Sequence, residues 1–352
     1  LQNNAIKVST IVWYLVLAGT WIFIYLKYDK EEKSNITMQY YREIPENYGP
    51  EILEYLLKKN ITSDGFSASI LNVIHKKALK VVSLSTKKDD YEFVKDESKM
   101  DQLTEEEKQV VSMLLVGIGN GKKVSLKDIK KFGKDYSTAK SFMSEYQSWN
   151  QSVVGKAKKE KFYQTASKPR VLGVLITIVG WLLFYLNLFF ETEFILGYLV
   201  LPVSIVAFIY FLMFKKRTTK GNLQYQKWMA FKRFLLDFGR MDEKTLPEIA
   251  IWEEYLVYAT VLGCAKQVEK QMQIKLQHMQ EYDPSFNLAD YYLMHTLIHV
   301  NMASTISNTI NHAVASSRAS IAQSNSSSGS GFGGGMSAGG GSFGGGGGGG
   351  RF

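Results

Sequence analysis

Long apolar stretches alternate with long polar ones in a set order along this chain. Three stretches carry no charged side chain: residues 8–26, 171–190 and 194–214. Each is close to the roughly 20 residues that a helix needs to cross the hydrocarbon core of a membrane. One such stretch is compatible with a buried core helix or, at the amino terminus, a signal sequence. Three in one chain predict a multi-pass membrane protein with three transmembrane helices.

Each predicted span has basic residues at the end that joins a long polar segment. Lys27 follows the first span, Arg170 precedes the second and Lys215 follows the third. Short loops rich in Lys and Arg stay on the cytoplasmic side of a membrane. We therefore expect a cell-membrane location with residues 27–170 and 215–352 in the cytoplasm, and with the N-terminus and the tip of the hairpin between the second and third spans outside the cell.

The chain begins at Leu1 rather than at a methionine. This start predicts a fragment whose missing part lies outside the cell, ahead of the first span. The single cysteine, Cys264, excludes an internal disulfide and fits the reducing cytoplasmic side. Its apolar surroundings predict a small core residue rather than a nucleophile.

Residues 46–96 contain two helical patterns followed by a hairpin pattern. Pro50 suits the first position of a helix, where the missing amide proton is not needed. Asp64 is placed to cap the second helix, and the polar turn at residues 87–90 separates two apolar strands. Helices followed by a two-stranded wing predict a winged-helix-like module.

Residues 97–167 repeat part of this theme. Thr104 and Glu107 form a capping-box pattern, and Ser125 begins a further helix. The predicted fold class is therefore a mainly α membrane protein: three transmembrane helices, tandem winged-helix-like α+β cytoplasmic modules and a tail.

Residues 222–323 form an amphipathic and helical region after the third span. One helical face of this region is rich in aromatic side chains. It predicts a helix that lies in the membrane interface, where aromatic side chains enter the boundary of the acyl chains. The alternative is a helix packed on the cytoplasmic modules. Further along, residues 287–323 are almost uncharged and predict a helix that pairs with a second copy of the chain. The candidate membrane-interface residues are Trp228, Phe231, Phe234, Leu235 and Phe238.

The last segment, residues 324–352, is rich in glycine. Fifteen of its final 24 residues are Gly. Such a sequence cannot bury enough surface to offset the entropy of ordering its backbone. We expect a disordered tail.

The net charge of +9 is unevenly distributed. Residues 46–96 hold eight Lys and eight acidic residues, whereas residues 97–169 hold fourteen Lys and nine acidic residues. A basic cluster in the second segment is predicted to face acidic lipid headgroups; the alternative is an ordinary solvated helix face. The candidate contact residues are Lys122, Lys123, Lys127, Lys130, Lys131 and Lys134.

Nucleic-acid binding by the winged-helix-like module is the second hypothesis. It would use the helix and wing between residues 66 and 94 and would depend steeply on salt. The neutral charge of that module argues against it, as does the scarcity of arginine: only Arg42 and Arg170 occur between the first two spans.

Patterns that suggest chemistry are incomplete. Residues 117–121 are glycine-rich but lack the strand and the Lys-Ser pair of a phosphate-binding loop. His295 and His299 have metal-ligand spacing, but Thr296 stands where a zinc protease has Glu, and no further ligands complete a site. We expect no catalytic, cofactor or metal site, and no enzyme activity.

One short run carries a family resemblance. Residues 252–263 read Trp-Glu-Glu-Tyr-Leu-Val-Tyr-Ala-Thr-Val-Leu-Gly, preceded by the ring-rich helix and followed by the glycine-rich end. Together they resemble the bacterial predicted membrane protein family called domain of unknown function 2207. The candidate partner-binding motif is Trp252, Glu253, Glu254 and Tyr255.

The resemblance implies a membrane location and the topology given above, but no activity, ligand or catalytic residue. Members of that family usually carry a signal peptide and an extracytoplasmic β-rich domain before the first span, and both are missing here. We therefore expect a non-enzymatic scaffold or signal-coupling protein. Its expected partners are membrane lipids, other proteins and a second copy of the chain.

Overall fold

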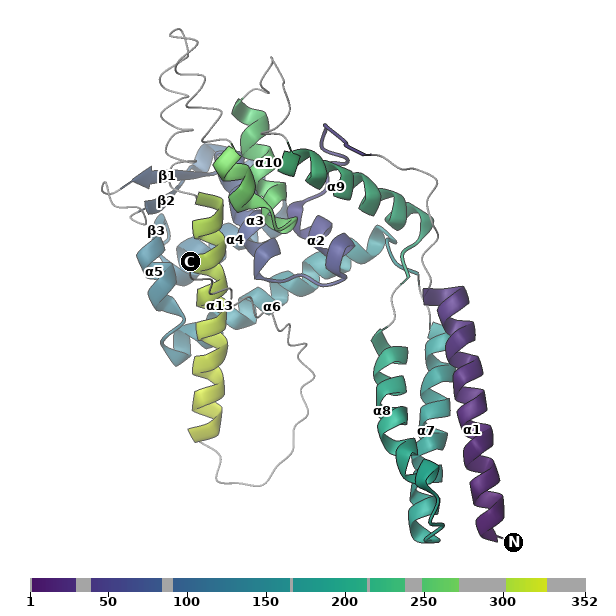
Figure 1. Ribbon diagram of the computed structural model, residues 1–352. Coiled ribbons are helices and arrows are strands. Elements are labelled where there is room, and N and C mark those ends of the chain that lie inside the picture. Colours follow the sequence, from purple (N-terminus) through teal and green to yellow (C-terminus); the bar gives the residue numbers. More distant parts are fainter. Residues whose placement is uncertain are drawn as a thin grey trace, which may run out of the picture.

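A computed structural model of the chain shows three long helices standing beside a larger body of helices and one small sheet (Figure 1). It describes residues 2–29, 39–83, 91–164, 167–213, 216–237, 249–271 and 302–327. The mainly helical architecture is as predicted, with one three-stranded sheet in the described part. Phe238, His295, His299 and the glycine-rich tail from residue 328 onwards lie outside the described residues.

The three long helices form what we call the membrane bundle. They are α1 (Gln2–Ile24), which continues into the π-helical turn η1 (Tyr25–Asp29), α7 (Ser167–Phe189) and α8 (Ile195–Met213). By length and composition all three qualify as membrane spans, over Asn3–Tyr28, Lys168–Phe189 and Ile195–Met213. Their outward faces expose large apolar side chains such as Leu15, Leu182 and Val206. The three predicted spans are confirmed as candidate membrane-crossing helices.

Small residues let the helices of the bundle approach closely. Gly180 of α7 faces the Trp13 ring of α1, where a Cβ would collide with the indole. The Trp13 indole N–H donates a hydrogen bond to the Ile176 carbonyl at 2.8 Å. Where lipid surrounds the helices, packing of this kind is what holds them together.

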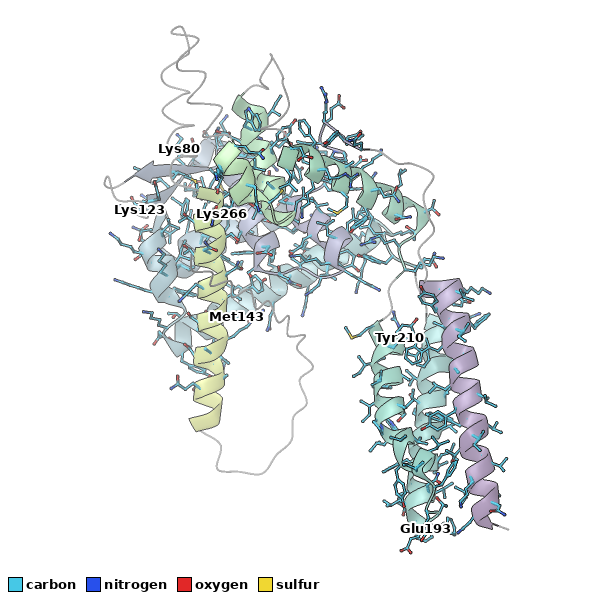
Figure 2. The ribbon with its side chains drawn as sticks, viewed as in Figure 1. Lys80, Lys123, Met143, Glu193, Tyr210 and Lys266 are labelled. Carbon is cyan, nitrogen blue, oxygen red and sulfur yellow. The ribbon has the colours of Figure 1, made fainter. Side chains whose placement is uncertain are left out.

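A buried polar cluster connects α1 to the hairpin of α7 and α8. The Asn187 amide donates to the Thr10 hydroxyl at 3.0 Å, and the Thr192 hydroxyl donates to the Asn187 amide oxygen at 2.8 Å. Glu193 marks the hairpin tip at the end of the bundle remote from the larger body, the same end as the N-terminus of α1 (Figures 1 and 2). The N-terminus of α1 and the hairpin tip therefore lie at the same end of the bundle.

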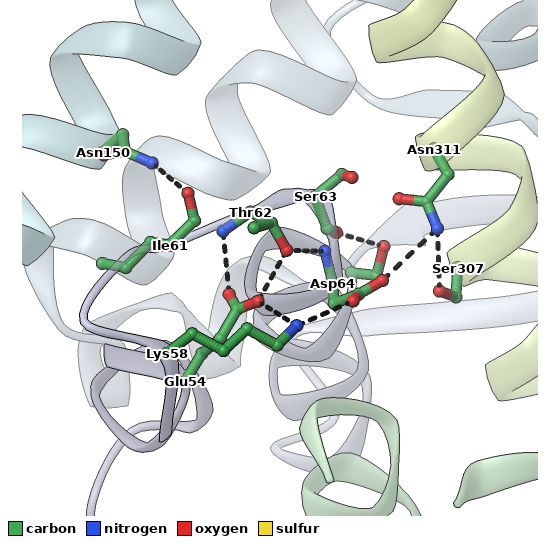
Figure 3. A network of polar contacts seen from close by, with 10 residues as sticks. Glu54, Lys58, Ile61, Thr62, Ser63, Asp64, Asn150, Ser307 and Asn311 are labelled. Atoms are coloured by element: carbon green, nitrogen blue, oxygen red, sulfur yellow. Dashed lines mark hydrogen bonds and ion pairs between the residues drawn. The ribbon is translucent and has the colours of Figure 1, made fainter. Parts of the chain in front are cut away.

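The remaining described residues, within 39–164 and 216–327, form what we call the head domain. Its first two helices are α2 (Pro50–Lys58), which begins at proline as predicted, and α3 (Ser63–His75). The cap of α3 is Thr62, whose hydroxyl accepts the Asp64 N–H at 3.2 Å, and not Asp64 itself. Buried Glu54 accepts the Thr62 N–H at 2.9 Å and so joins the two helices (Figure 3).

The sheet combines strands from both predicted modules. Strands β1 (Leu79–Ser83) and β2 (Tyr91–Lys95) form the predicted antiparallel hairpin, and β3 (Lys123–Ser125) pairs antiparallel with β2, giving the order β1-β2-β3. Phe93 in the central strand lies opposite Val81 on one side and Val124 on the other. Because β3 belongs to the second predicted module, the two modules share one sheet.

The second predicted module is helical apart from β3. Its elements are the 3₁₀ helix η2 (Glu97–Gln102), α4 (Glu105–Ser112), the π-helix η3 (Met113–Ile118), α5 (Leu126–Phe132) and α6 (Tyr136–Lys159). The capping box of Thr104 and Glu107 is present, and Ser125 forms another with Asp128. Phe66 of α3 contacts Trp149 of α6 within the same hydrophobic cluster. The described residues of the two predicted modules thus share one packed core instead of forming two tandem modules.

Three further helices complete this core: α9 (Thr219–Asp237), α10 (Ile249–Val261) and α13 (Met302–Ser327). Helix α13 packs against α3, α5 and α6. Its apolar positions Met302, Ile306, Ile310 and Val314 are all buried in the common cluster. The prediction that this helix pairs with another copy is wrong for that face, because the chain's own head domain covers it.

Candidate functional site

The head domain meets the membrane bundle where the chain approaches α7 and leaves α8. Tyr163 and Arg217, which stand on these two segments, form an antiparallel β-bridge. Beside it the Thr218 N–H donates to the Phe162 carbonyl at 2.8 Å. Gly221 of α9 lies so close to that carbonyl that a Cβ would collide with it. The segments before α7 and after α8 are therefore held side by side.

The same segments are anchored in the head domain. The Arg217 guanidinium lies 3.7 Å from the centroid of the Tyr225 ring on α9, a cation–π contact. The Tyr163 hydroxyl donates to the Leu56 carbonyl at the end of α2, at 2.8 Å. We call Tyr163, Arg217 and Tyr225 the junction. It ties the segments before α7 and after α8 to α2 and α9.

The predicted membrane-interface face of α9 lies inside the head domain. Trp228, Phe231, Phe234 and Leu235 are each at most 2% exposed. Trp228 packs on Tyr258 of α10, with ring centroids 4.9 Å apart. The interfacial placement is therefore wrong for these four residues, and the alternative of a helix packed on the cytoplasmic modules holds, because α10 covers the ring-rich face that lipid was expected to cover.

The candidate partner-binding motif on α10 serves internal packing. Trp252 and Tyr255 are buried in the core, and the Tyr255 hydroxyl donates to the Arg42 carbonyl at 3.0 Å. Glu253 contacts His75 and Lys77 at the end of α3. Glu253 therefore connects α10 to the end of α3, and Tyr255 packs on Phe231 of α9, so this motif serves the chain's own packing. Glu254 is half-buried.

The contacts of Glu253 shift its ionisation. Its carboxylate lies 3.3 Å from the His75 Nδ1 and 2.7 Å from the Lys77 Nζ. Burial acts to raise the pKa of Glu253, but the contacts with His75 and Lys77 outweigh burial and hold that pKa below its usual value.

Three cations that the nucleic-acid hypothesis would use are paired within the chain. Lys76 lies 2.6 Å from Glu107, Lys77 contacts Glu253, and Lys80 lies 2.7 Å from Asp96. Lys87 and Lys88 of the wing lie outside the described residues. Binding phosphates would require these pairs to break, which weighs against that hypothesis.

The structure divides the predicted basic contact patch. Lys122 and Lys123 lie at the sheet, where Lys123 pairs with Glu92 at 2.9 Å. The other four, Lys127, Lys130, Lys131 and Lys134, lie on α5 or just after it. Of the six, Lys130 and Lys134 reach a groove between α5 and α13.

This groove is polar and has a volume of about 570 Å³. Its described lining consists of Lys130, Lys134, Thr305, Asn308, Thr309 and His312. The four α13 residues recur at the i, i+3, i+4 and i+7 spacing of one helical stripe. The sequence reasoning followed the apolar stripe of α13 and missed this polar one, although both have the same period.

Helix α13 is fixed in place at several points. At its first turn the Glu269 carboxylate accepts the Ala303 N–H at 2.9 Å. Near its middle the Asn311 amide donates to Asp64 at 3.3 Å (Figure 3). Burial raises the pKa of Glu269, against the opposing effect of the hydrogen bonds that it accepts from Ser304 and Ala303. The α13 wall of the groove is thus part of the head domain's fixed structure.

The other features that suggested chemistry in the sequence are the cysteine, the glycine-rich turn and clusters of metal ligands. Cys264 is buried, and burial raises the pKa of its thiol to about 11, so it is a core residue and a poor nucleophile. The glycine-rich turn follows η3, and the Gly119 N–H donates to the Leu114 carbonyl at 3.0 Å. Among the described residues, no group of three His, Cys, Asp or Glu side chains is placed to hold a metal ion.

Comparison with known proteins yields one family. The model described as "Predicted membrane protein (DUF2207) C-terminal domain" matches residues 37–272. No curated protein and no solved structure matches the chain. The matched residues include the head-domain elements from α2 to α10, both spans of the hairpin and the junction.

Proposed function

The chain belongs to the predicted membrane protein family DUF2207, and from that premise we propose that it is a non-enzymatic, membrane-anchored coupling protein. In this role the membrane bundle passes a change in its position to the head domain, which contacts other proteins. The junction is the observation that supports the proposal most directly.

The junction supports coupling because it fastens to each other, and to the head domain, the segments that lead into α7 and out of α8. The β-bridge of Tyr163 and Arg217 joins the segment before α7 to the segment after α8. Tyr225 and Leu56 then hold these segments on α9 and α2. A tilt of the hairpin would therefore shift α2 and α9, where freely jointed linkers would absorb the movement.

Charge supports a cytoplasmic head domain. Lys27 and Lys216 lie at the head end of the bundle, where the Lys216 ammonium donates to the Lys27 carbonyl at 3.4 Å. The opposite tip carries Glu191 and Glu193. The lysines at the head end support a head in the cytoplasm and a tip outside the cell.

Protein partners fit the head domain better than nucleic acid does. Helices α2 and α3 followed by the β1–β2 hairpin keep the winged-helix-like order of residues 46–96, and that order is also used for protein contacts. The cations of this region that the structure describes are largely committed to carboxylates, as at Lys76 and Glu107.

Sidedness tests the proposed orientation. In a Cys264→Ser background, single cysteines replace Glu193 at the exposed tip and Gln151 on the exposed face of α6. Intact cells are treated with a membrane-impermeant maleimide, and lysed cells provide the full-labelling control. Labelling of position 193 alone is expected. Labelling of position 151 in intact cells would overturn the cytoplasmic assignment.

Coupling is tested with spin labels at the same two positions in the full chain, reconstituted in lipid nanodiscs. We expect one narrow distance distribution that broadens in Arg217→Ala, because the variant loses the contact with Tyr225. Lys158→Ala, a charge-matched change on the exposed end of α6, is expected to leave it narrow. A distance distribution that Arg217→Ala leaves unchanged would overturn coupling through the junction.

A separate result, turnover of a substrate by the purified full-length protein, would overturn the non-enzymatic role.

A further inference from the structure

Exposed lysines gather at the end of the membrane bundle that joins the head domain. Residues 156–170, which run into α7, include six basic side chains and one acidic side chain, Glu160. Glu160 pairs with Lys220 at 2.8 Å. Lys161 and Lys168 are exposed, as is Lys27 in η1, and none of these three forms an ion pair within the described part of the chain. We call Lys27, Lys161 and Lys168 the rim lysines.

Hydrogen bonds beside the junction hold the rim lysines near one another. Gln164, three residues after Lys161, donates its N–H to the Lys216 carbonyl at 2.9 Å. The Lys216 ammonium in turn donates to the Lys27 carbonyl at 3.4 Å. Lys168 follows Gln164 by four residues, in the first turn of α7. The rim lysines therefore stand on or close to one continuous series of hydrogen bonds.

The same end of the bundle has the features of a membrane–water interface. The candidate span of α7 begins at Lys168. The Lys27 ammonium lies 5.5 Å from the centroid of the Tyr28 ring. Trp21 packs beside Tyr210 with ring centroids 5.0 Å apart, and Tyr210 lies at the head end of α8 (Figure 2). Trp and Tyr gather at the level of the lipid headgroups, and lysines beside them extend their ammonium groups to the same level.

Local structure gives little reason for lysine at two of these positions. Lys161 has a φ of 54°, in the left-handed region that favours Gly or Asn after the end of a helix. Lys168 stands in the first turn of α7, where the helix dipole disfavours a cation. A negatively charged surface facing these side chains would give both lysines a favourable interaction.

We propose that the rim lysines bind the headgroups of acidic phospholipids in the leaflet next to the head domain. Each lysine near a membrane surface attracts acidic lipids, and three of them meet a headgroup such as that of phosphatidylglycerol together. The bound lipids hold the segments of the junction at the membrane surface. This contact adds a lipid partner to the proposed coupling role but does not depend on that role, because it needs no movement of the bundle.

The test uses the full chain reconstituted in phosphatidylcholine membranes and electron paramagnetic resonance of spin-labelled lipids. Phosphatidylglycerol and phosphatidylcholine that carry the same nitroxide-labelled chain are added separately. The motionally restricted fraction of each lipid gives its relative affinity for the protein. We expect a preference for phosphatidylglycerol of about threefold at low salt. It is expected to fall towards onefold in about 1 M sodium chloride, where the Debye length is about 3 Å.

Matched triple variants separate the rim lysines from the general charge of the protein. Replacing all three rim lysines by Gln is expected to lower the preference to about 1.5-fold or less. The control triple removes the same charge from exposed head-domain lysines near the sheet, on α5 and at the start of α6, and is expected to keep the preference. The control substitutions are Lys122→Gln, Lys131→Gln and Lys140→Gln.

A third variant separates loss of charge from damage to the fold. Replacing all three rim lysines by Arg keeps their charge, and the preference for phosphatidylglycerol is expected to stay within about twofold of the wild-type value. Three results would overturn the proposal: no preference in the wild type, equal losses in the two Gln triples, or loss of the preference in the Arg triple. The distance distribution of Arg217→Ala tests the coupling role separately, so the two proposals can fail independently.

Discussion

Glu253 on α10 reaches across to His75 on α3, with 3.3 Å between its Oε2 and the His75 Nδ1. The same carboxylate contacts Lys77, just beyond the end of α3. Glu253, in the run of residues 252–263 that carries the family resemblance, thus connects two helices that lie far apart in the sequence. It is 11% exposed, so its partners are not readily replaced by water.

Glu253→Gln is therefore expected to destabilise the head domain. The change removes the carboxylate charge that the Lys77 ammonium and the His75 imidazole contact, and we expect a loss of about 1–3 kcal/mol in the free energy of unfolding. Glu254→Gln, the same change at the half-buried neighbour, is the control, with an expected effect below about 0.5 kcal/mol. Denaturant unfolding of the protein in nanodiscs measures both, and equal losses would show that the contacts of Glu253 carry no special weight.

The contribution of Glu253 also depends on pH. Because its pKa is lowered in the folded protein, its stabilisation is present above the ordinary value of 4.5 and is lost as the pH falls through the lower folded value. The stability gap between wild type and Glu253→Gln is therefore expected to shrink below pH 4.5. Unfolding curves recorded from about pH 7 downwards measure this gap. A gap that widens below pH 4.5 would contradict the lowered pKa.

The second prediction concerns Glu269, which caps the first turn of α13. Glu269→Ala removes the acceptor of the Ala303 N–H and should cost about 1–2 kcal/mol. The raised pKa of Glu269 means that ionisation costs the folded state, so its contribution to stability falls as the pH rises from 4.5 through the raised value. Glu269→Gln keeps an acceptor without that charge and is expected to be less harmful at neutral pH. Hydrogen exchange of the α13 amides measures both variants; equal acceleration by the two would contradict the prediction.

A third prediction compares two glycines of the head domain. Gly221→Ala places a methyl group against the Phe162 carbonyl beside the junction and should cost about 1–3 kcal/mol. A Cβ at Gly155 of α6 meets nothing within 4 Å, so Gly155→Ala is expected to stabilise the helix by about 0.5–1 kcal/mol. Thermal unfolding of the full chain distinguishes the two. Stabilisation by Gly221→Ala would show that the segments at the junction are free to move apart.

The fourth prediction applies the same comparison to the membrane bundle. Gly180→Ala would push the Trp13 ring away from α7, whereas a Cβ at Gly19 of α1 meets nothing within 4 Å. The first change is expected to weaken the contact of α1 with α7 by about 1–3 kcal/mol, and the second to leave it nearly unchanged. Titration with sodium dodecyl sulfate, followed by tryptophan fluorescence, measures the loss of the bundle. Equal midpoints for the two variants would contradict close packing at Gly180.

Local features of the fold were predictable because they depend on neighbours in the sequence. The three spans follow from length and the absence of charge, and the capping box at Thr104 from two residues three positions apart. The hairpin of β1 and β2 follows from apolar strands around a polar turn. The cap of α3 was predicted at Asp64 but lies two positions earlier, at Thr62, because either residue type caps a helix and only backbone geometry decides between them.

The faces of the helices were not predictable to the same degree. The ring-rich stripe of α9 fits lipid or protein equally well by composition, and Trp228 against Tyr258 shows that α10 covers it. Likewise, the apolar stripe of α13 predicted a partner, and its own head domain is that partner. Lys130 and Lys134 line a groove only because α13 brings Asn308 and His312 opposite them.

What the sequence by itself determined is the set of candidate membrane-crossing helices, most helix starts and the hairpin, since each rests on short-range rules of length, capping and turn chemistry. The tertiary structure alone decided that β3 joins the hairpin, that both predicted modules share one core, and that Lys130 faces α13. An amphipathic pattern specifies that a face must be covered, but contacts between distant segments decide what covers it.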